Sequence, residues 1–148
     1  MRPGNHLPGS HAWHPKTLTK RPKPLSGVRV LVVEDEILQA LALEDIIVKL
    51  GGAAPVIVCR FEHAMEALNG REFDCAILDL NLSGTLSFPI ADRLQERGVP
   101  ILFCTAYADA AKLFAGTAVC LDKPIERVAL RDALLGLLKQ APRKASKH

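Results

Sequence analysis

The sequence predicts an α/β fold in which a single parallel β-sheet is covered by helices on both faces. Short apolar runs alternate with segments of helical periodicity along residues 28–138. The run Cys75-Ala76-Ile77-Leu78 is apolar at every position, as expected for a strand that is buried on both faces. The links between the segments are short, which favours a simple succession of strands and crossover helices.

Five strands and five helices are expected within this alternation. The strands are predicted at residues 28–33, 55–59, 75–78, 100–104 and 117–121. The helices are predicted at about 37–50, 61–68, 88–96, 109–114 and 126–138. Gly51-Gly52 ends the first helix, as a C-terminal cap does. In that helix, the spacing of apolar residues predicts a buried stripe of Leu38, Leu41, Ala42 and Ile46.

The length and charge of the chain define its domain organisation. With 148 residues, there is room for one domain with a substantial core and not for two. Residues 1–26 carry a net charge of +5 and residues 139–148 carry +4, so the residues between them carry −6. We expect a disordered basic leader at 1–26, an acidic domain at 27–138 and a basic tail at 139–148. Solvated ends are the simplest interpretation, and contact with nucleic acid or an acidic membrane surface is left open.

The cysteines and the apolar segments indicate the compartment. No apolar run approaches the roughly 20 residues of a membrane span, and the N-terminus lacks the apolar segment of a secretory signal. The four cysteines, which lack the close pairing of a zinc site, are Cys59, Cys75, Cys104 and Cys120. Each lies in a different apolar segment, which is typical of small buried side chains. These features predict a cytoplasmic protein with reduced cysteines.

Polar residues follow the predicted strands at their carboxyl ends, which meet at one edge of a parallel sheet. The set comprises Glu34, Asp35, Asp79, Thr105 and Lys123. Clustered carboxylates repel one another by roughly 4 kcal/mol at an effective dielectric of about 20, so a cation is needed among them. Lys123 and a Mg²⁺ ion held by oxygen ligands are the two candidates. A metal-bound carboxylate beside an ammonium and a hydroxyl group is suited to receive a phosphoryl group.

In these residues the chain resembles the receiver domain of two-component response regulators. The resemblance covers residues 28–138 and is carried by Glu34-Asp35, Asp79, Thr105-Ala106 and Lys123-Pro124. It implies a flavodoxin-like (CheY-like) doubly wound sheet with strand order 2-1-3-4-5. The fourth helix is expected to be shortened, because only 17 residues separate Thr105 from Lys123. The chain is also similar to alphaproteobacterial single-domain receivers with a Phe-Ala-Thr-Gly-like fourth strand, although Cys104 and Ala106 replace the alanine and the glycine.

The resemblance implies a role for each matching residue. Asp79 is expected to accept a phosphoryl group from a histidine kinase or a histidine phosphotransfer protein. The expected Mg²⁺ site comprises Asp35, Asp79 and the backbone carbonyl of Asn81 as ligands, with Glu34 helping through water. Thr105 and Lys123 are expected to bind the phosphoryl group, and Lys123-Pro124 is expected to be a cis peptide.

One departure from the family pattern concerns how the signal is transmitted. Cys120 occupies the position, three residues before the lysine, at which receivers usually carry a tyrosine or phenylalanine that reports phosphorylation. We therefore hypothesise that phosphorylation orders the segment 107–116, with Tyr107 as a substitute aromatic. The alternative is that Tyr107 is a passive residue at the rim of the site.

The predicted function is a stand-alone phosphorylation switch that passes a phosphoryl group along a relay or changes its affinity for a partner protein. The alternative is a phosphorylation-independent interaction module with the same fold. No helix-turn-helix follows residue 138, so a DNA-binding domain is not expected. No Gly-rich phosphate loop follows the first strand, as a nucleotide-binding enzyme would require. The protein is not expected to be an enzyme, apart from catalysing its own phosphorylation and dephosphorylation, and a downstream partner and a homodimer are left open.

Overall fold

Five parallel strands form one sheet in the order β2-β1-β3-β6-β7 in the computed structural model, which describes residues 23–114 and 116–140. The strands are β1 (Val30–Val33), β2 (Val56–Val58), β3 (Cys75–Leu78), β6 (Ile101–Thr105) and β7 (Val119–Asp122). Since β6 and β7 are the fourth and fifth strands of this sheet along the chain, the predicted flavodoxin-like class and its order 2-1-3-4-5 are confirmed.

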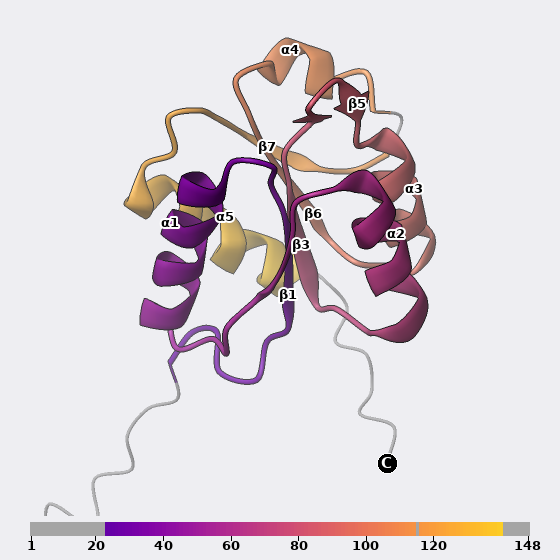
Figure 1. Ribbon diagram of the computed structural model, residues 1–148. Helices are drawn as coiled ribbons and strands as arrows, with labels where there is room; N and C mark the ends of the chain where they lie inside the picture. The colour runs from indigo at the N-terminus through magenta and orange to yellow at the C-terminus, as the bar shows by residue number, and fades with distance from the viewer. Residues whose placement is uncertain (1–22, 115, 141–148) are drawn as a thin grey trace, which may run out of the picture.

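The helices cover both faces of the sheet. They are α1 (Ile37–Lys49), α2 (Phe61–Gly70), α3 (Phe88–Glu96), α4 (Ala108–Ala111) and α5 (Arg127–Gln140). Helices α1 and α5 lie on one face, and α2 and α3 lie on the other (Figure 1). The predicted shortening of the fourth helix is confirmed, because α4 contains only four residues. Within the described residues, no helix is both long and apolar enough to cross a membrane.

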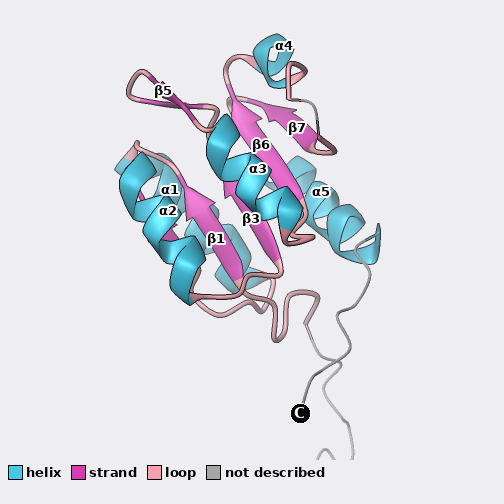
Figure 2. Ribbon diagram, turned by 90° about the vertical axis from the view of Figure 1, so that its right-hand side faces the viewer, coloured by secondary structure: helices cyan, strands magenta, loops and turns pink. Residues whose placement is uncertain are grey.

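The central strands β1, β3 and β6 are buried along their whole length. Their side chains alternate between two apolar clusters, as the pleat of a strand requires. Val30 and Val32 pack with α1 and α5, whereas Leu31 and Val33 pack with α2 and α3. The arrows of β1, β3 and β6 point toward the end of the sheet at which α4 and β5 lie (Figure 2). A rigid scaffold therefore presents the carboxyl ends of these strands at one edge.

Helix α1 turns a different face to the core from the one predicted. The buried residues are Ala40, Leu43 and Ile47, whereas Leu38 is 81% exposed and Leu41 is 49% exposed. The predicted stripe is therefore wrong at Leu38, Leu41 and Ala42, which are exposed, whereas Ile46 is half-buried and packs against the core. Most positions of this helix are apolar, so periodicity does not single out one face, and contact with the sheet selects it.

The described part of the domain begins before the expected boundary at residue 27. Leu25 is completely buried beside α1 and α5, and its N–H donates to the carbonyl of Leu50 at 3.0 Å. A single leucine among prolines has no periodicity, so this contact could not be predicted from the apolar pattern. The rest of the expected leader, residues 1–22, lies outside the described residues, as does the tail from 141, while residues 139–140 complete α5.

A small hairpin that was not predicted follows β3. It pairs β4 (Asn81–Leu82) with β5 (Thr85–Leu86) in antiparallel register. The two turn residues both have positive φ, 51° at Ser83 and 96° at Gly84, a combination that two-residue type I′ hairpin turns use. The Asn81 side chain closes the turn by accepting a 2.7 Å hydrogen bond from the Gly84 N–H. This hairpin holds the chain close to the carboxyl end of β3.

Candidate functional site

The backbone brings the predicted site residues to one edge of the sheet. Glu34 and Asp35 follow β1, Asp79 follows β3, and Thr105 is the last residue of β6. The N–H of Asp79 donates to the carbonyl of Val33 at 2.8 Å, which continues the pairing of β1 with β3 past the strand end. The N–H of Lys123 donates to the carbonyl of Thr105 at 3.0 Å, and this bond continues the pairing of β6 with β7 past the end of β7.

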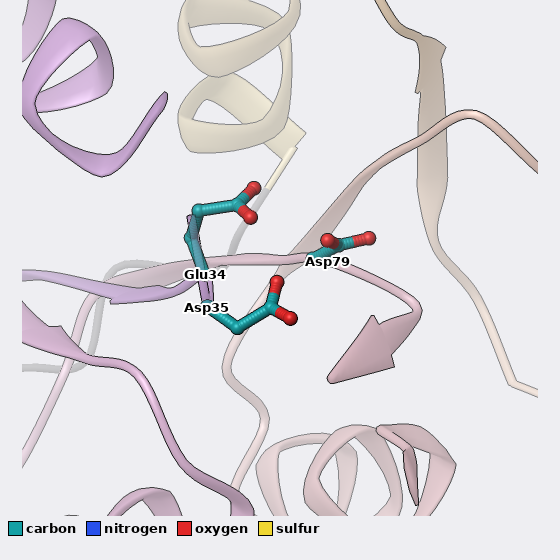
Figure 3. Close-up of side chains that lie close together, drawn as sticks. All are labelled: Glu34, Asp35 and Asp79. Atoms are coloured by element: carbon teal, nitrogen blue, oxygen red, sulfur yellow. The ribbon is translucent and has the colours of Figure 1, made fainter. Parts of the chain in front are cut away.

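Three carboxylates converge at this edge. One oxygen each from Glu34, Asp35 and Asp79 lies within 4.8 Å of the others. Figure 3 shows Glu34 and Asp35 extending from the end of β1 toward Asp79 on the neighbouring strand. Glu34 is only 1% exposed and Asp79 7% exposed, whereas Asp35 is partly open to solvent. Such proximity raises the energy of the ionised forms unless a cation lies between them.

Lys123 supplies that cation. Its Nζ atom lies 2.9 Å from Glu34 Oε2 and 3.1 Å from Asp79 Oδ2, so it bridges the two buried carboxylates. Burial alone would lower the pKa of Lys123, but the hydrogen bonds to Glu34 and Asp79 outweigh burial and raise that pKa above its usual value. Lys123 is therefore held as an ammonium ion, and its peptide bond to Pro124 is cis, as the family resemblance implied.

The two acidic residues after β1 have opposite pKa shifts. Burial raises the pKa of Glu34 to about 7, against the opposing effect of the Lys123 ammonium group. The pKa of Asp35 lies below its usual value. Partial burial alone would raise this pKa, but the hydrogen bond from Ser83 and further hydrogen bonds at the carboxylate outweigh the effect of burial. Asp35 is therefore the more readily ionised of the two.

Thr105 is completely buried, and its hydroxyl oxygen accepts a 3.0 Å hydrogen bond from the N–H of Tyr107. Among the described residues, no hydrogen bond joins this hydroxyl to Asp79. Asn81 donates weakly from its N–H to Asp79 Oδ1 at 3.5 Å, and the role of its backbone carbonyl as a metal ligand stays a prediction. The structure thus brings Glu34, Asp35, Asp79 and Lys123 together, with the Thr105 hydroxyl directed toward the start of α4.

Two serines at this site were not singled out from the sequence. Ser83 Oγ donates to Asp35 Oδ2 at 2.7 Å, and Ser87 Oγ donates to the backbone carbonyl of Asp79 at 2.7 Å. Both depend on the β4–β5 hairpin, whose strands have only two residues each and give no periodic signal. The residues Ser83-Gly84 indicated a turn but not its position beside Asp35.

The cysteines are only partly as predicted. Cys75 and Cys104 are buried, and burial raises the pKa of each thiol to about 12. Cys59 is half-buried, and Cys120 is exposed, so the expectation that all four are buried is wrong. Cys120 lies on β7, an edge strand that is left uncovered on this face because α4 is so short.

An all-oxygen group of carboxylates is the donor set that hard divalent cations prefer. Glu34, Asp35 and Asp79 each offer one oxygen to such an ion, and Lys123 forms its salt bridges with Glu34 and Asp79 and not with Asp35. The residues present therefore fit Mg²⁺.

Comparisons with known proteins agree with this geometry. The model of the family described as response regulator receiver domain matches residues 30–135. The chain is 30% identical over 122 residues to the transcriptional regulatory protein TcrA of Mycobacterium tuberculosis, and the match covers 81% of this chain and 48% of TcrA. The chain therefore spans about half the length of the curated relatives it matches.

Two solved structures illustrate the likeness of the fold. The solution structure of SdrG from Sphingomonas melonis Fr1 is 31% identical, with a TM-score of 0.63, and the match covers 78% of this chain and 98% of SdrG. The receiver domain of the sensor histidine kinase PA1611 from Pseudomonas aeruginosa PAO1 is 24% identical, with a TM-score of 0.69. That match covers 78% of this chain and all of the other, whose structure holds a magnesium ion coordinated in its active-site cleft.

Proposed function

Because this chain belongs to the family of response regulator receiver domains, we propose that it is a phosphorylation switch whose phosphoacceptor is Asp79. The phosphoryl donor is a histidine kinase or a histidine phosphotransfer protein, and the phosphorylated domain signals through contact with another protein. One observation carries this proposal: Lys123 Nζ bridges Asp79 and Glu34, with Asp35 beside them, at the carboxyl edge of the sheet.

In the proposed reaction Asp79 acts as the nucleophile. An oxygen of its carboxylate forms a bond to phosphorus while the phosphorus–nitrogen bond of the donor phosphohistidine breaks, which gives an acyl phosphate. The hydrogen bond from the Asp79 N–H to the Val33 carbonyl and the bond from Ser87 Oγ to the Asp79 carbonyl hold the backbone of Asp79 beside β1. Such positioning supplies much of the catalysis in phosphoryl transfer.

Glu34, Asp35, Asp79 and the backbone carbonyl of Asn81 are the residues proposed to hold Mg²⁺. When bound, the ion neutralises negative charge on the oxygens of the transferred group. Lys123 contributes a fixed positive charge on the other side of Asp79, and its two salt bridges hold the ammonium group in place before the donor arrives. Thr105 contributes a hydroxyl group at the end of the neighbouring strand, and its rotation toward the phosphoryl group breaks the bond from the Tyr107 N–H.

The same arrangement supports loss of the phosphoryl group to water, so the switch resets itself. Apart from this self-directed chemistry we propose no enzymatic activity. The transcriptional function in the name of TcrA belongs to a longer protein, of which the match covers only 48%, and is not transferred to this chain.

Intact mass spectrometry of the full chain with Mg²⁺ and a small-molecule phosphodonor tests the proposal. We expect one phosphoryl adduct on the wild type that requires Mg²⁺ and is absent from Asp79→Asn. Asp92→Asn is a matched control, because Asp92 is an exposed carboxylate on α3 and its removal is expected to leave the adduct unchanged.

Some receivers accept the phosphoryl group only from a protein donor, so the same comparison is repeated with phosphorylated histidine phosphotransfer proteins. An adduct that survives in Asp79→Asn contradicts the assignment of the phosphoacceptor. A wild type that accepts no phosphoryl group from any donor and binds no Mg²⁺ favours a phosphorylation-independent interaction module instead.

A further inference from the structure

Ser83 forms a side-chain contact between the β4–β5 hairpin and the acidic cluster. Its hydroxyl group donates a 2.7 Å hydrogen bond to Asp35 Oδ2, across 48 positions of sequence. The hairpin turn sets this geometry, because Ser83 has a φ of 51° and Asn81 closes the turn through the Gly84 N–H. A positive φ is uncommon for a residue other than glycine, so the position of the hydroxyl is not a generic property of a surface serine.

The contact makes the two oxygens of Asp35 unequal. Oδ2 accepts a 2.7 Å hydrogen bond from the Ser83 hydroxyl group, and this is the largest hydrogen-bonding effect at Asp35; Glu34 and the backbone N–H groups of Asp35 and Ser83 contribute less. Lys123 neutralises Glu34 and Asp79 and does not reach Asp35. Asp35 therefore has one oxygen held by the hairpin and one oxygen available to a ligand.

The number of available oxygens matters for the choice of cation. Mg²⁺ is bound in a near-ideal octahedral geometry and takes single oxygens from carboxylates, with water completing the set. Ca²⁺ takes about six to eight oxygens at longer distances and frequently uses both oxygens of one carboxylate. A carboxylate with one oxygen already engaged is a poorer ligand for Ca²⁺ than a free carboxylate and remains a good ligand for Mg²⁺.

We propose that Ser83 determines the metal specificity of the site by occupying Asp35 Oδ2, which restricts Asp35 to one-oxygen ligation and favours Mg²⁺ over Ca²⁺. This inference rests on the proposed function, in which Glu34, Asp35 and Asp79 hold a divalent cation. Ser83 is a positioning residue, since it acts through Asp35 and does not itself need to touch the metal.

The test is to measure the dissociation constants of Mg²⁺ and of Ca²⁺ by calorimetry, on the full chain without any phosphodonor. Ser83→Gly and Ser83→Ala both remove the hydroxyl group, but only glycine adopts the positive φ without strain. Thr85→Ala is the matched control, because Thr85 is an exposed hydroxyl residue of the same hairpin. Removing a side chain that hydrogen-bonds to a metal ligand typically weakens metal affinity by about 10- to 100-fold, so we expect Mg²⁺ affinity to fall within that range.

We expect Ca²⁺ affinity to fall less or to rise, so that the preference for Mg²⁺ over Ca²⁺ drops at least several-fold in both Ser83 variants and is retained in Thr85→Ala. Equal loss of affinity for both cations overturns the inference, because it would show a structural role only. An effect in Ser83→Ala that is absent from Ser83→Gly also overturns it, since backbone strain would then be the cause. A wild type that binds neither cation overturns the proposed metal site itself, whereas a wild type that binds Mg²⁺ with an unchanged preference in the variants overturns only the role of Ser83.

Discussion

Ser87 Oγ donates a buried 2.7 Å hydrogen bond to the backbone carbonyl of Asp79, the proposed phosphoacceptor. Ser87 precedes α3 at the position where serine often caps a helix, yet its hydroxyl group makes no capping bond. Its N–H donates to the carbonyl of Leu80 at 2.8 Å. Ser87 thus fixes the loop after β3 at two points and holds the peptide that carries the nucleophile.

Ser87→Ala is expected to lower the free energy of unfolding by about 1–3 kcal/mol, because it leaves a buried carbonyl group without its donor. Urea unfolding followed by circular dichroism measures this change. Thr85→Ala serves as the control, since the exposed hydroxyl of Thr85 is expected to contribute within about 0.5 kcal/mol. Equal stability of the Ser87 and Thr85 variants would contradict the importance of the buried bond.

The buried carboxyl group of Glu34 predicts a pH dependence of stability in the metal-free protein. Burial raises its pKa to about 7 in the folded state, so the folded protein binds a proton that the unfolded chain, with a pKa near 4.5, has already released. This stabilising contribution is fully present below about pH 4.5 and is lost as the pH rises through about 7.

The variant Glu34→Gln removes this titration. With EDTA present, we expect its stability relative to the wild type to increase between pH 5 and pH 8, as measured by thermal unfolding at several pH values. Glu36→Gln is the control, because Glu36 is an exposed neighbour. A difference between Glu34→Gln and wild type that is constant across this range would show that Glu34 does not titrate there.

Three phenylalanines anchor α4 to the rest of the domain. Phe114 stacks on Phe88 with ring centroids 6.2 Å apart, and its edge meets Phe103 at 5.6 Å. Phe114→Ala is expected to cost about 3 kcal/mol of stability, within the range of buried phenylalanine truncations. The adjacent Leu113 is 77% exposed, so Leu113→Ala is expected to change stability by less than about 0.5 kcal/mol in the same denaturation experiment. Similar losses in the two variants would mean that the aromatic packing does not hold α4.

The contact between Thr105 and Tyr107 predicts how phosphorylation reaches this segment. If the Thr105 hydroxyl rotates toward the phosphoryl group, the Tyr107 N–H loses its acceptor, and hydrogen exchange at that amide is expected to change on phosphorylation. Thr105→Ser keeps the acceptor and is expected to retain the response, whereas Thr105→Ala is expected to abolish it. Exchange across residues 107–114 that is unaffected by phosphorylation would remove this segment from the signalling pathway. Tyr107 itself is 60% exposed, which leaves its ring free to contact a partner.

Long apolar runs and the polar residues after them were enough to predict the sheet and the cluster. The apolar runs of β1, β3 and β6 are uninterrupted, which is typical of strands that are buried on both faces. Parallel strands end at the same edge of a sheet, so they bring Glu34, Asp79 and Thr105 together there. What the sequence could not reveal depends on contacts between distant segments. The buried Leu25 is one example, because a single residue has no period.

The remaining differences also have tertiary causes. The face that α1 buries was mispredicted because nearly every face of that helix is apolar, and only the sheet decides between them. Cys120 was expected to be buried because its strand is apolar, but a strand at the edge of a sheet is covered only where a helix lies over it. Ser83 and Ser87 could not be recognised as site residues without the hairpin that positions them.

The brevity of α4 has a consequence for the energetics of recognition. A helix of four residues does not form by itself in water, because nucleation is not repaid by so few hydrogen bonds. Its order depends on the Thr105 acceptor at one end and the Phe114 stack at the other, so we expect the segment 105–114 to open locally at a lower free energy than the sheet. A partner protein that binds only the ordered form of the segment 105–114 binds more weakly, because its affinity is lowered in proportion to the fraction of molecules in which the segment is open. Substitutions that shift this local equilibrium therefore change binding strength without touching the binding partner.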